Sequence, residues 1–176
     1  MPTIIPASIQ AAGTVKVTFL PALANPAAPT LIELNGTDAV DLSFFFRADA
    51  FAIAIAQDKV DDTRLGDAAK REALGLPAYT IDNLRYMYNP QALPTAPDNK
   101  AYTILKEGVN GFFALRFGSK ALLSSADWAA TQRVGSVYQV SLGAQLKTIP
   151  TGDNAIHQIE QNVTTALVGS DILLSA

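Results

Sequence analysis

The chain has 176 residues, of which 49% are hydrophobic and 16% are charged, and its formal net charge is −3. This composition is that of a globular protein, and the length suits one domain with a real core. No cluster of lysine and arginine offers a strong grip on nucleic acid, and the lack of cysteine excludes disulfides, thiolate metal sites and cysteine nucleophiles. The only histidine is His157, which argues against a zinc site or a histidine base.

Residues 1–13 are expected to form an extended N-terminal arm, because they contain two prolines, mixed polarity and a terminal glycine. They lack the basic region and the long apolar stretch of a secretory signal. The longest apolar runs, at 44–46 and 50–56, are far shorter than the roughly 20 residues of a membrane span. We therefore expect a soluble protein made in a cytoplasm, with no membrane insertion and one β domain over residues 14–176.

Strands are predicted on both sides of a proline-rich loop near the start of this domain. Thr14–Leu20 alternates apolar and polar residues, which is typical of a half-buried strand. Pro21–Pro29 holds three prolines and is predicted to be a loop. Thr30–Leu34 and Ala39–Phe46 flank the dipeptide Asn35-Gly36, which favours a tight turn, so these two segments are predicted to form a hairpin.

The segment 57–77, which follows a short apolar strand predicted at Phe51–Ala56, is the most charged part of the chain. Asp67–Leu74 contains helix-forming residues and an acid–base pair spaced i,i+4, and Gly75 and Pro77 follow as stop signals. We predict a long solvated loop that carries about two helical turns. Loops of this length are commonly functional or contact partners.

One helix is predicted in the middle of the chain, between two strands. A tyrosine-rich strand is expected at Ala78–Asn89 and a compact apolar strand at Gly111–Phe117. Between them, residues 98–107 show the apolar stripe of a helix, with Asp98 as a candidate cap and Gly108 as a candidate stop.

The last third, residues 133–170, is predicted to be a hairpin of two unusually long strands. From Val134 to Leu146 the even positions are mostly apolar and the odd positions between them are polar. Since successive side chains of a strand point to opposite faces, one face is apolar and the other is polar. At roughly 3.3 Å per residue the run spans about 45 Å, more than twice a typical strand. Strands of this length are more typical of the wall of a water-filled channel than of a compact β-sandwich.

The polar positions of these strands are candidates to line a water-filled channel. In the second strand Ile159, Val163 and Leu167 share one parity, and polar residues take the other. If several copies place these strands side by side, the result is a closed barrel without free edges. Its interior would be hydrophilic and weakly charged, which allows DNA to pass without sticking. The candidate channel-facing residues are Gln139, Ser141, Gln145, Lys147, Gln158, Glu160, Asn162 and Thr164.

Three chemical motifs are not supported by their spacing. Gly118-Ser119-Lys120 lacks the upstream glycine of a phosphate loop and is interpreted as a turn. The three acids between positions 58 and 62 lack the order of an EF-hand and indicate a solvated loop. His157 near Asp153 and Glu160 has no serine nucleophile elbow, so a partly exposed sheet histidine is the better interpretation. We predict no catalytic residue, no metal site and no cofactor.

Four successive segments carry a resemblance to a known family. They read FAIAIAQDKVDDTRLGDAAKREALG, YTIDNLRYMYNPQ, NKAYTILKEGVNGFFALRFG and VGSVYQVSLGAQLKTIP. The order combines a Val-Asp-Asp-x-Arg loop at Val60–Arg64, a tyrosine-rich strand ending at Asn89-Pro90, a helix running into Lys106-Glu107-Gly108 and a closing strand pair. Over about residues 40–170 the chain resembles the major tail proteins of long-tailed bacteriophages, and most nearly the tail tube subunits of phages that infect actinobacteria.

The resemblance implies a mainly β fold, a β-sandwich or partial barrel of the tail tube type flanked by one α-helix. It further implies that six subunits form a ring whose inner strands make a continuous, closed β-barrel. Rings would stack through the long loop and the terminal arms. The implied ring-stacking residues are Asp58, Asp61, Asp62, Arg64, Asp67 and Arg71.

By the same resemblance, the protein is expected to be a structural component of the virion tail, assembled in the host cytoplasm. Its expected partners are further copies of itself, the tape measure protein, and the tail tip and terminator proteins. DNA would pass through the tube without specific binding.

Two other interpretations stay open. A tube protein of a contractile injection or type VI secretion system has a related fold. A monomeric β-sandwich that binds sugars or peptides would expose aromatic residues on a concave face, with Tyr86, Tyr88 and Trp128 as candidates. An enzyme is the least supported class.

Overall fold

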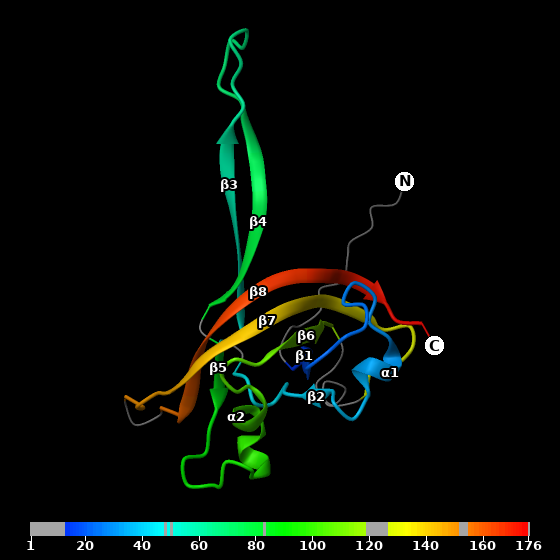
Figure 1. The fold of residues 1–176 in the computed structure, drawn as a ribbon, viewed down its shortest axis with the longest axis vertical. Helices are drawn as coiled ribbons and strands as arrows, with labels where there is room; N and C mark the ends of the chain where they lie inside the picture. Colours follow the sequence, from blue (N-terminus) through cyan, green and yellow to red (C-terminus); the bar gives the residue numbers. More distant parts are fainter. Residues whose placement is uncertain are drawn as a thin grey trace, which may run out of the picture.

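The computed structural model describes residues 13–47, 49, 51–82, 84–118, 127–151 and 155–175. Six antiparallel strands form a sheet in the order β2-β1-β6-β7-β8-β5 that curls into a half-barrel, and the two-stranded hairpin β3-β4 projects from it (Figure 1). The strands are β1 Lys16–Leu20, β2 Val40–Asp41, β3 Ala52–Asp61, β4 Glu72–Asp82, β5 Leu84–Met87, β6 Asn110–Arg116, β7 Arg133–Lys147 and β8 Gln158–Leu173. The helices are α1 Leu31–Leu34, η1 Pro97–Asn99 and α2 Lys100–Ile104. The predicted N-terminal arm lies outside the described residues, apart from Gly13.

The long hairpin predicted at 133–170 is confirmed. β7 has 15 residues and β8 has 16, and they pair from Arg133 opposite Leu173 to Lys147 opposite Ile159. The register shifts twice, between Val137 and Tyr138 and again between Leu142 and Gln145. Such bulges bend the strands and increase their twist, which suits a sheet that curls.

Two apolar cores lie on opposite faces of the sheet. Phe113 and Tyr138 are cross-strand partners in the main core, which also contains residues of α2 and of the base of β4. The neighbouring pair, Ala114 and Val137, belongs to a second core beneath α1 and Trp128. Because both faces are covered at this end of the sheet, every residue of β1 is buried. The prediction of a half-buried first strand was therefore wrong, although a strand is present.

The hairpin predicted around Asn35-Gly36 was wrong. Thr30 instead caps the short helix α1: Glu33 N donates to Thr30 Oγ1 at 3.3 Å, and Thr30 N donates to Glu33 Oε2 at 2.9 Å. This reciprocal capping box satisfies two backbone donors that a helix start would leave unpaired. Asn35 is the C-cap of the helix, and only Val40–Asp41 of the second predicted strand forms regular ladder pairs.

The long loop with helical turns predicted at 57–77 was also wrong. Gln57 pairs with Pro77, and Lys59, Val60 and Asp61 pair with Leu74, Ala73 and Glu72 in the β3-β4 ladder. The only connecting segment is 62–71, so backbone pairing overrides the local helix propensity. The expected Asp67–Arg71 pair is present at 3.7 Å within this connection. The single strand predicted at Ala78–Asn89 is divided into the end of β4 and β5.

The predicted helix at 98–107 is present in shorter form. A 3₁₀ turn, η1, precedes α2, and the helix ends at Ile104. Asp98 makes no capping bond. Asn99 occupies the N-cap, and its buried amide donates to the carbonyl oxygens of Asn89 and Leu93 at 3.0 and 3.1 Å. Gly108 has φ +77° and lies in the turn before β6 rather than at the helix end.

Candidate assembly surfaces

One face of β7 and β8 is exposed and lined mainly by polar side chains, with Ala166 and the exposed Leu146 among them. Ser141 and Thr164 are cross-strand partners on this face, and both are exposed. Glu160 shares the face and lies opposite Arg85 of β5, with Arg85 NH2 and Glu160 Oε1 at 3.4 Å, so the two charges offset each other. We call this surface the polar face. Of the predicted channel-facing residues it contains Gln139, Ser141, Gln158, Glu160, Asn162 and Thr164.

Gln145 and Lys147 lie on the opposite face, so they do not join the other predicted channel residues. Leu142 pairs with Val163 but Gln145 pairs with Gln161, which leaves one extra residue in β7 and reverses the parity that follows. Gly143 sits in this bulge, where an added Cβ would lie 2.9 Å from the Asn162 carbonyl oxygen. Lys147 Nζ lies 4.8 Å from the ring centre of Tyr88, and hydrogen bonding to Tyr88 raises the pKa of Lys147.

A buried amide network ties the strands to the end of α2. The Gln145 amide donates to the Tyr86 hydroxyl at 2.7 Å, and the Tyr86 hydroxyl donates to Gln161 Oε1 at 3.3 Å. The Gln161 amide donates to the Leu105 and Gly143 carbonyl oxygens. Burial raises the pKa of the Tyr86 phenol, so it stays protonated and can donate. Sequence reasoning missed this network, although Gln161 shares the parity of apolar Ile159 and Val163.

β8 has a long backbone edge that no strand covers within the described part of the chain. β7 pairs with β8 as far as Leu173, whereas β5 pairs with it only from Gln158 to Gln161. The stretch 162–173, which we call the β8 edge, therefore presents N–H and C=O groups on its outer side. β4 approaches it where Thr165 Oγ1 donates to the Tyr79 carbonyl oxygen at 2.6 Å. A sheet edge of this length is a template for pairing with another chain.

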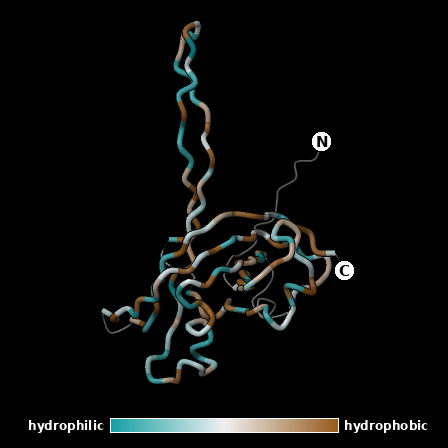
Figure 2. Tube along the Cα trace, viewed as in Figure 1, coloured by the Kyte–Doolittle hydropathy of each residue, from teal (hydrophilic) through white to brown (hydrophobic). Residues whose placement is uncertain are grey.

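The β3-β4 hairpin is anchored only at its base. Ile53 and Ile81 are cross-strand partners that pack in or against the main core. Beyond them the hairpin extends away from the body and carries apolar residues as far as its tip (Figures 1 and 2). Leu65, Leu74 and Leu76 are exposed to 110%, 68% and 93%. An isolated two-stranded hairpin is at best marginally stable in water, and these apolar side chains stay uncovered within the described part of the chain.

The predicted ring-stacking residues all lie in the outer half of this hairpin. Asp58 and Asp61 are in β3, and the other four are in the connection 62–71. The tip has internal order: Thr63 N donates to Asp61 Oδ1 and Arg64 N donates to Asp67 Oδ2, both at 2.9 Å. The hydrogen bonds from Thr63 lower the pKa of Asp61. The tip therefore presents its charges from a defined loop.

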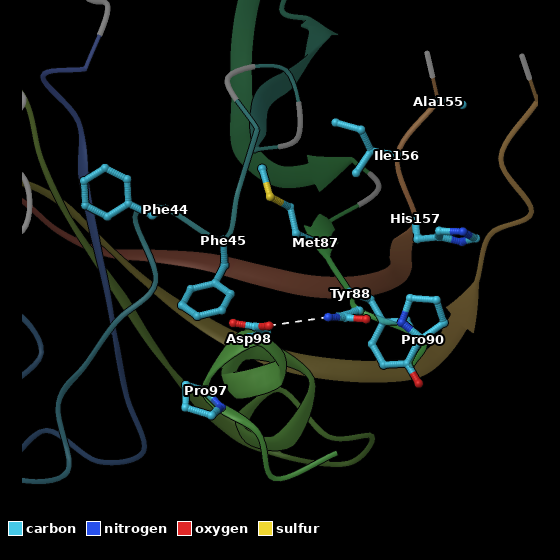
Figure 3. Close-up of a pocket in the computed structure, with 11 residues that line it drawn as sticks. Phe44, Phe45, Met87, Tyr88, Pro90, Pro97, Asp98, Ala155, Ile156 and His157 are labelled. Atoms are coloured by element: carbon cyan, nitrogen blue, oxygen red, sulfur yellow. Dashed lines mark hydrogen bonds between the residues drawn. The ribbon is translucent and has the colours of Figure 1, made fainter. Parts of the chain in front are cut away.

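A largely apolar cavity of about 680 Å³ lies beside the end of β5 (Figure 3). We call it the β5 pocket. Asp98 is the only carboxylate among the described residues that line it, and one of its oxygens accepts from Asn89 Nδ2 at 3.4 Å. His157 also lines the pocket; it is exposed and directly precedes β8. The remaining lining residues are Phe44, Phe45, Met87, Tyr88, Pro90, Pro97, Ala155 and Ile156.

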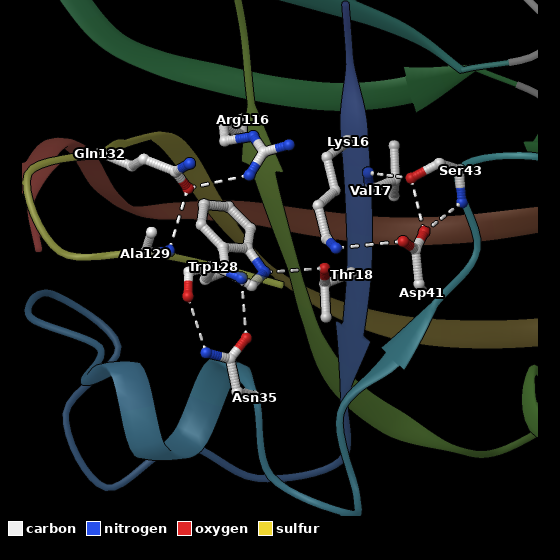
Figure 4. Close-up of polar contacts among 10 residues, drawn as sticks. All are labelled: Lys16, Val17, Thr18, Asn35, Asp41, Ser43, Arg116, Trp128, Ala129 and Gln132. Carbon is white, nitrogen blue, oxygen red and sulfur yellow. Dashed lines mark hydrogen bonds and ion pairs between the residues drawn. The ribbon is translucent and has the colours of Figure 1, made fainter. Parts of the chain in front are cut away.

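A buried polar cluster holds α1 and Trp128 against the first strands (Figure 4). Lys16 Nζ lies 3.1 Å from Asp41 Oδ2, and Trp128 Nε1 donates to Thr18 Oγ1 at 3.1 Å. Arg116 lies over the Trp128 ring at 5.5 Å, and burial lowers the pKa of its guanidinium. Trp128 and Tyr86 are both buried, which removes two of the three aromatic residues that a ligand-binding module was expected to expose.

Within the described residues, no group of three or more His, Cys, Asp or Glu is arranged to hold a metal ion. No helix in that part of the chain is long and apolar enough to cross a membrane. A search of curated proteins finds no match. A family model described as phage tail tube protein matches residues 1–167.

Proposed function

The chain belongs to the phage tail tube protein family, and we propose that six copies form a ring and that stacked rings make the tube through which DNA passes. The observation that carries this proposal is that one chain has both an uncovered hairpin and an unpaired strand edge. The β3-β4 hairpin projects without cover, and the β8 edge lacks a strand partner among the described residues. Both features are liabilities in a free monomer and useful only in an assembly.

The β8 edge supports closure of the ring. A strand from a neighbouring copy that pairs with 162–173 continues the sheet across the subunit boundary. Repetition around a ring gives a closed barrel, which removes all free edges. The half-barrel curl of one subunit sheet is consistent with such a wall.

The polar face is the surface proposed to line the tube. Gln139, Ser141 and Thr164 offer amide and hydroxyl groups, and the Arg85–Glu160 pair adds no net charge. DNA binding strength depends on the number of phosphates that cations neutralise. A lining without net positive charge therefore gives a polyanion no tight site. This proposal excludes Gln145 and Lys147, whose side chains lie on the other face.

The projecting hairpin is proposed to make the contact between stacked rings, with the charges at positions 58–71 contributing. A single exposed ion pair contributes only about 0–1 kcal/mol, but every contact is repeated around the ring. We propose that the subunit assembles in the host cytoplasm, around the tape measure protein and between tail tip and terminator proteins. It has a structural rather than an enzymatic role. Its nearest relatives are proposed to be the tail tube subunits of actinobacterial phages, on the resemblance of residues 40–170.

Electron microscopy of the purified, concentrated protein tests this proposal. The expected result is hollow tubes or rings with six-fold symmetry. A monomer at every concentration would overturn the proposal and return the ligand-binding module to consideration. The neighbouring genes separate a phage tail tube from the tube of a contractile injection or type VI secretion system.

A further inference from the structure

The tip of the hairpin is a narrow apolar projection. Leu65 is fully exposed and makes no covering contact with its own chain. An added Cβ at the adjacent Gly66 would meet nothing within 4 Å, so the tip has open space around it. Arg64 stands directly before Leu65 and takes part in none of the ion pairs among the described residues. The tip therefore offers one leucine directly after a cation, Arg64, that is in none of these ion pairs, with the carboxylates of Asp61 and Asp62 shortly before it in the chain.

The β5 pocket has the complementary features. Phe44, Met87 and Ile156 line it while staying exposed to 64%, 36% and 45%, so apolar surface is left uncovered there. Its volume of about 680 Å³ exceeds the space that a single side chain needs. The carboxylate of Asp98 lies among these apolar side chains (Figure 3).

The two features lie at opposite ends of the molecule. The hairpin tip is at one end of the longest axis, whereas β5 and α2, which border the pocket, lie toward the other end (Figure 1). Contact between two different surfaces of identical chains is heterologous, and it repeats head to tail instead of closing on a dimer. A contact of this kind builds rows of copies, which is what stacked rings require.

We propose that the β5 pocket receives the hairpin tip of a copy in the adjacent ring, with Leu65 entering the pocket and Arg64 pairing with Asp98. This inference rests on the proposed function, because it names the acceptor of the hairpin within the tube. Burial of Leu65 in the apolar pocket supplies most of the contact, and the Arg64–Asp98 pair favours one orientation of the tip.

Charge reversal tests the pair. Arg64→Glu and Asp98→Arg are each expected to raise the critical concentration for tube assembly by about tenfold, because each places like charges together. The double variant restores opposite charges and is expected to assemble within about twofold of the wild type. Both residues are exposed, so circular dichroism should stay unchanged in all three. Losses that simply add in the double variant would overturn the Arg64–Asp98 pairing.

A cross-link tests the docking itself, and the cysteine-free chain makes it unambiguous. Leu65→Cys protein is mixed with Ile156→Cys protein, assembled and oxidised; a disulfide forms only if the two Cβ atoms come within about 4.5 Å. We expect a covalent dimer in this mixture and none in the matched control, Leu65→Cys with Ile32→Cys, since Ile32 is exposed on α1. Tubes that form without the Leu65–Ile156 cross-link, or that cross-link at Ile32 instead, would overturn this inference while leaving the proposed function intact. Absence of tubes in the wild type would overturn the proposed function first.

Discussion

Gln145 and Gln161 are cross-strand partners whose side-chain amides donate to the same acceptor, the Leu105 carbonyl oxygen, at 2.9 and 3.0 Å. Leu105 is the C-cap of α2, so two neighbouring strands hold the end of the helix through one atom. The Tyr86 hydroxyl lies between the two amides and bonds to both. These bonds explain why polar residues occupy positions that face the main core.

Replacing Gln161 by leucine should destabilise the monomer. The change leaves the Gly143 carbonyl without this donor and the Tyr86 hydroxyl without its acceptor, in a site where Gln161 is only 1% exposed. Buried polar groups left unpaired cost about 1–3 kcal/mol, so the free energy of unfolding in urea should fall by about that amount. Gln139→Leu, on the polar face, is the matched control and should change it by about 0.5 kcal/mol or less. Equal losses for the two variants would show that the network contributes little.

Gly111→Ala is expected to destabilise β6. A Cβ at this position would lie 2.7 Å from the Leu20 carbonyl oxygen and 2.5 Å from the ring of Phe19, and the backbone atom cannot move without shifting β1. Overpacking of this kind costs about 1–3 kcal/mol. Gly66→Ala serves as the control, because no atom lies within 4 Å of its added Cβ. Thermal unfolding of the two variants separates the effects, and a stable Gly111→Ala variant would contradict the close contact of β1 and β6.

The carboxylate of Glu33 should make the α1 region sensitive to acid. Hydrogen bonds from the backbone of Thr30 and Ala24 lower the pKa of Glu33 from its ordinary value of 4.5. Because the folded pKa lies below the unfolded one, the stabilisation is complete above the unfolded value and is lost as the pH falls through the folded value. Glu33→Gln should keep the capping geometry, because glutamine also serves at this position, but should flatten the pH dependence.

The fluorescence of Trp128, the only tryptophan, can report acid unfolding of the α1 region. The side chain of Asn35, at the end of α1, makes two hydrogen bonds of 2.8 Å with the backbone of Trp128. Unfolding monitored by this fluorescence should show the flatter pH dependence of Glu33→Gln. The control, Glu107→Gln, should retain the acid dependence of the wild type. A wild-type profile that matches Glu33→Gln at every pH would contradict the role of this cap.

Positive charge on the polar face should slow DNA passage. Gln139→Lys with Asn162→Lys adds two cations per subunit to the proposed lining, and each neutralised phosphate adds salt-dependent affinity. Tubes should still assemble, and DNA ejection from particles should slow most at low salt. The matched variant, Gln139→Glu with Asn162→Glu, should not slow it. Ejection that is unchanged in the lysine variant at low salt would show that the polar face does not line the tube.

The sequence predicts those parts of the fold whose signal is periodic over many residues. Long alternation identified β7 and β8, and the apolar stripe near Ala101 identified α2. The dipeptide Asn35-Gly36 led to a wrong prediction of a hairpin, because the reciprocal Thr30–Glu33 cap stabilises the helix α1 there. The segment 57–77 was predicted wrongly for another reason: its strand pairing joins residues as distant as Gln57 and Pro77, and its sequence shows no apolar alternation.

The residues of the polar face could be predicted from the sequence wherever side chains alternate regularly along β7 and β8. Gln139 and Thr164 follow the alternation and lie on the polar face. Gln145 and Lys147 do not, because the bulge at Gly143 shifts β7 by one residue. A glycine within a strand is the one local sign of such a bulge. The β8 edge and the β5 pocket depend on how distant segments meet, which no local pattern encodes.

In the proposed assembly the β8 edge and the β3-β4 hairpin are exposed in the free subunit and covered in the tube. Hydrogen–deuterium exchange on both states tests this most directly, because amide protection reports whether a backbone edge is paired. We predict that amides of 57–77, and those amides of 162–173 that point away from β7, exchange rapidly in the monomer and become protected on assembly, while those of the buried strand β1 stay protected throughout. Equal exchange of these two segments in monomer and tube would contradict the proposed assembly.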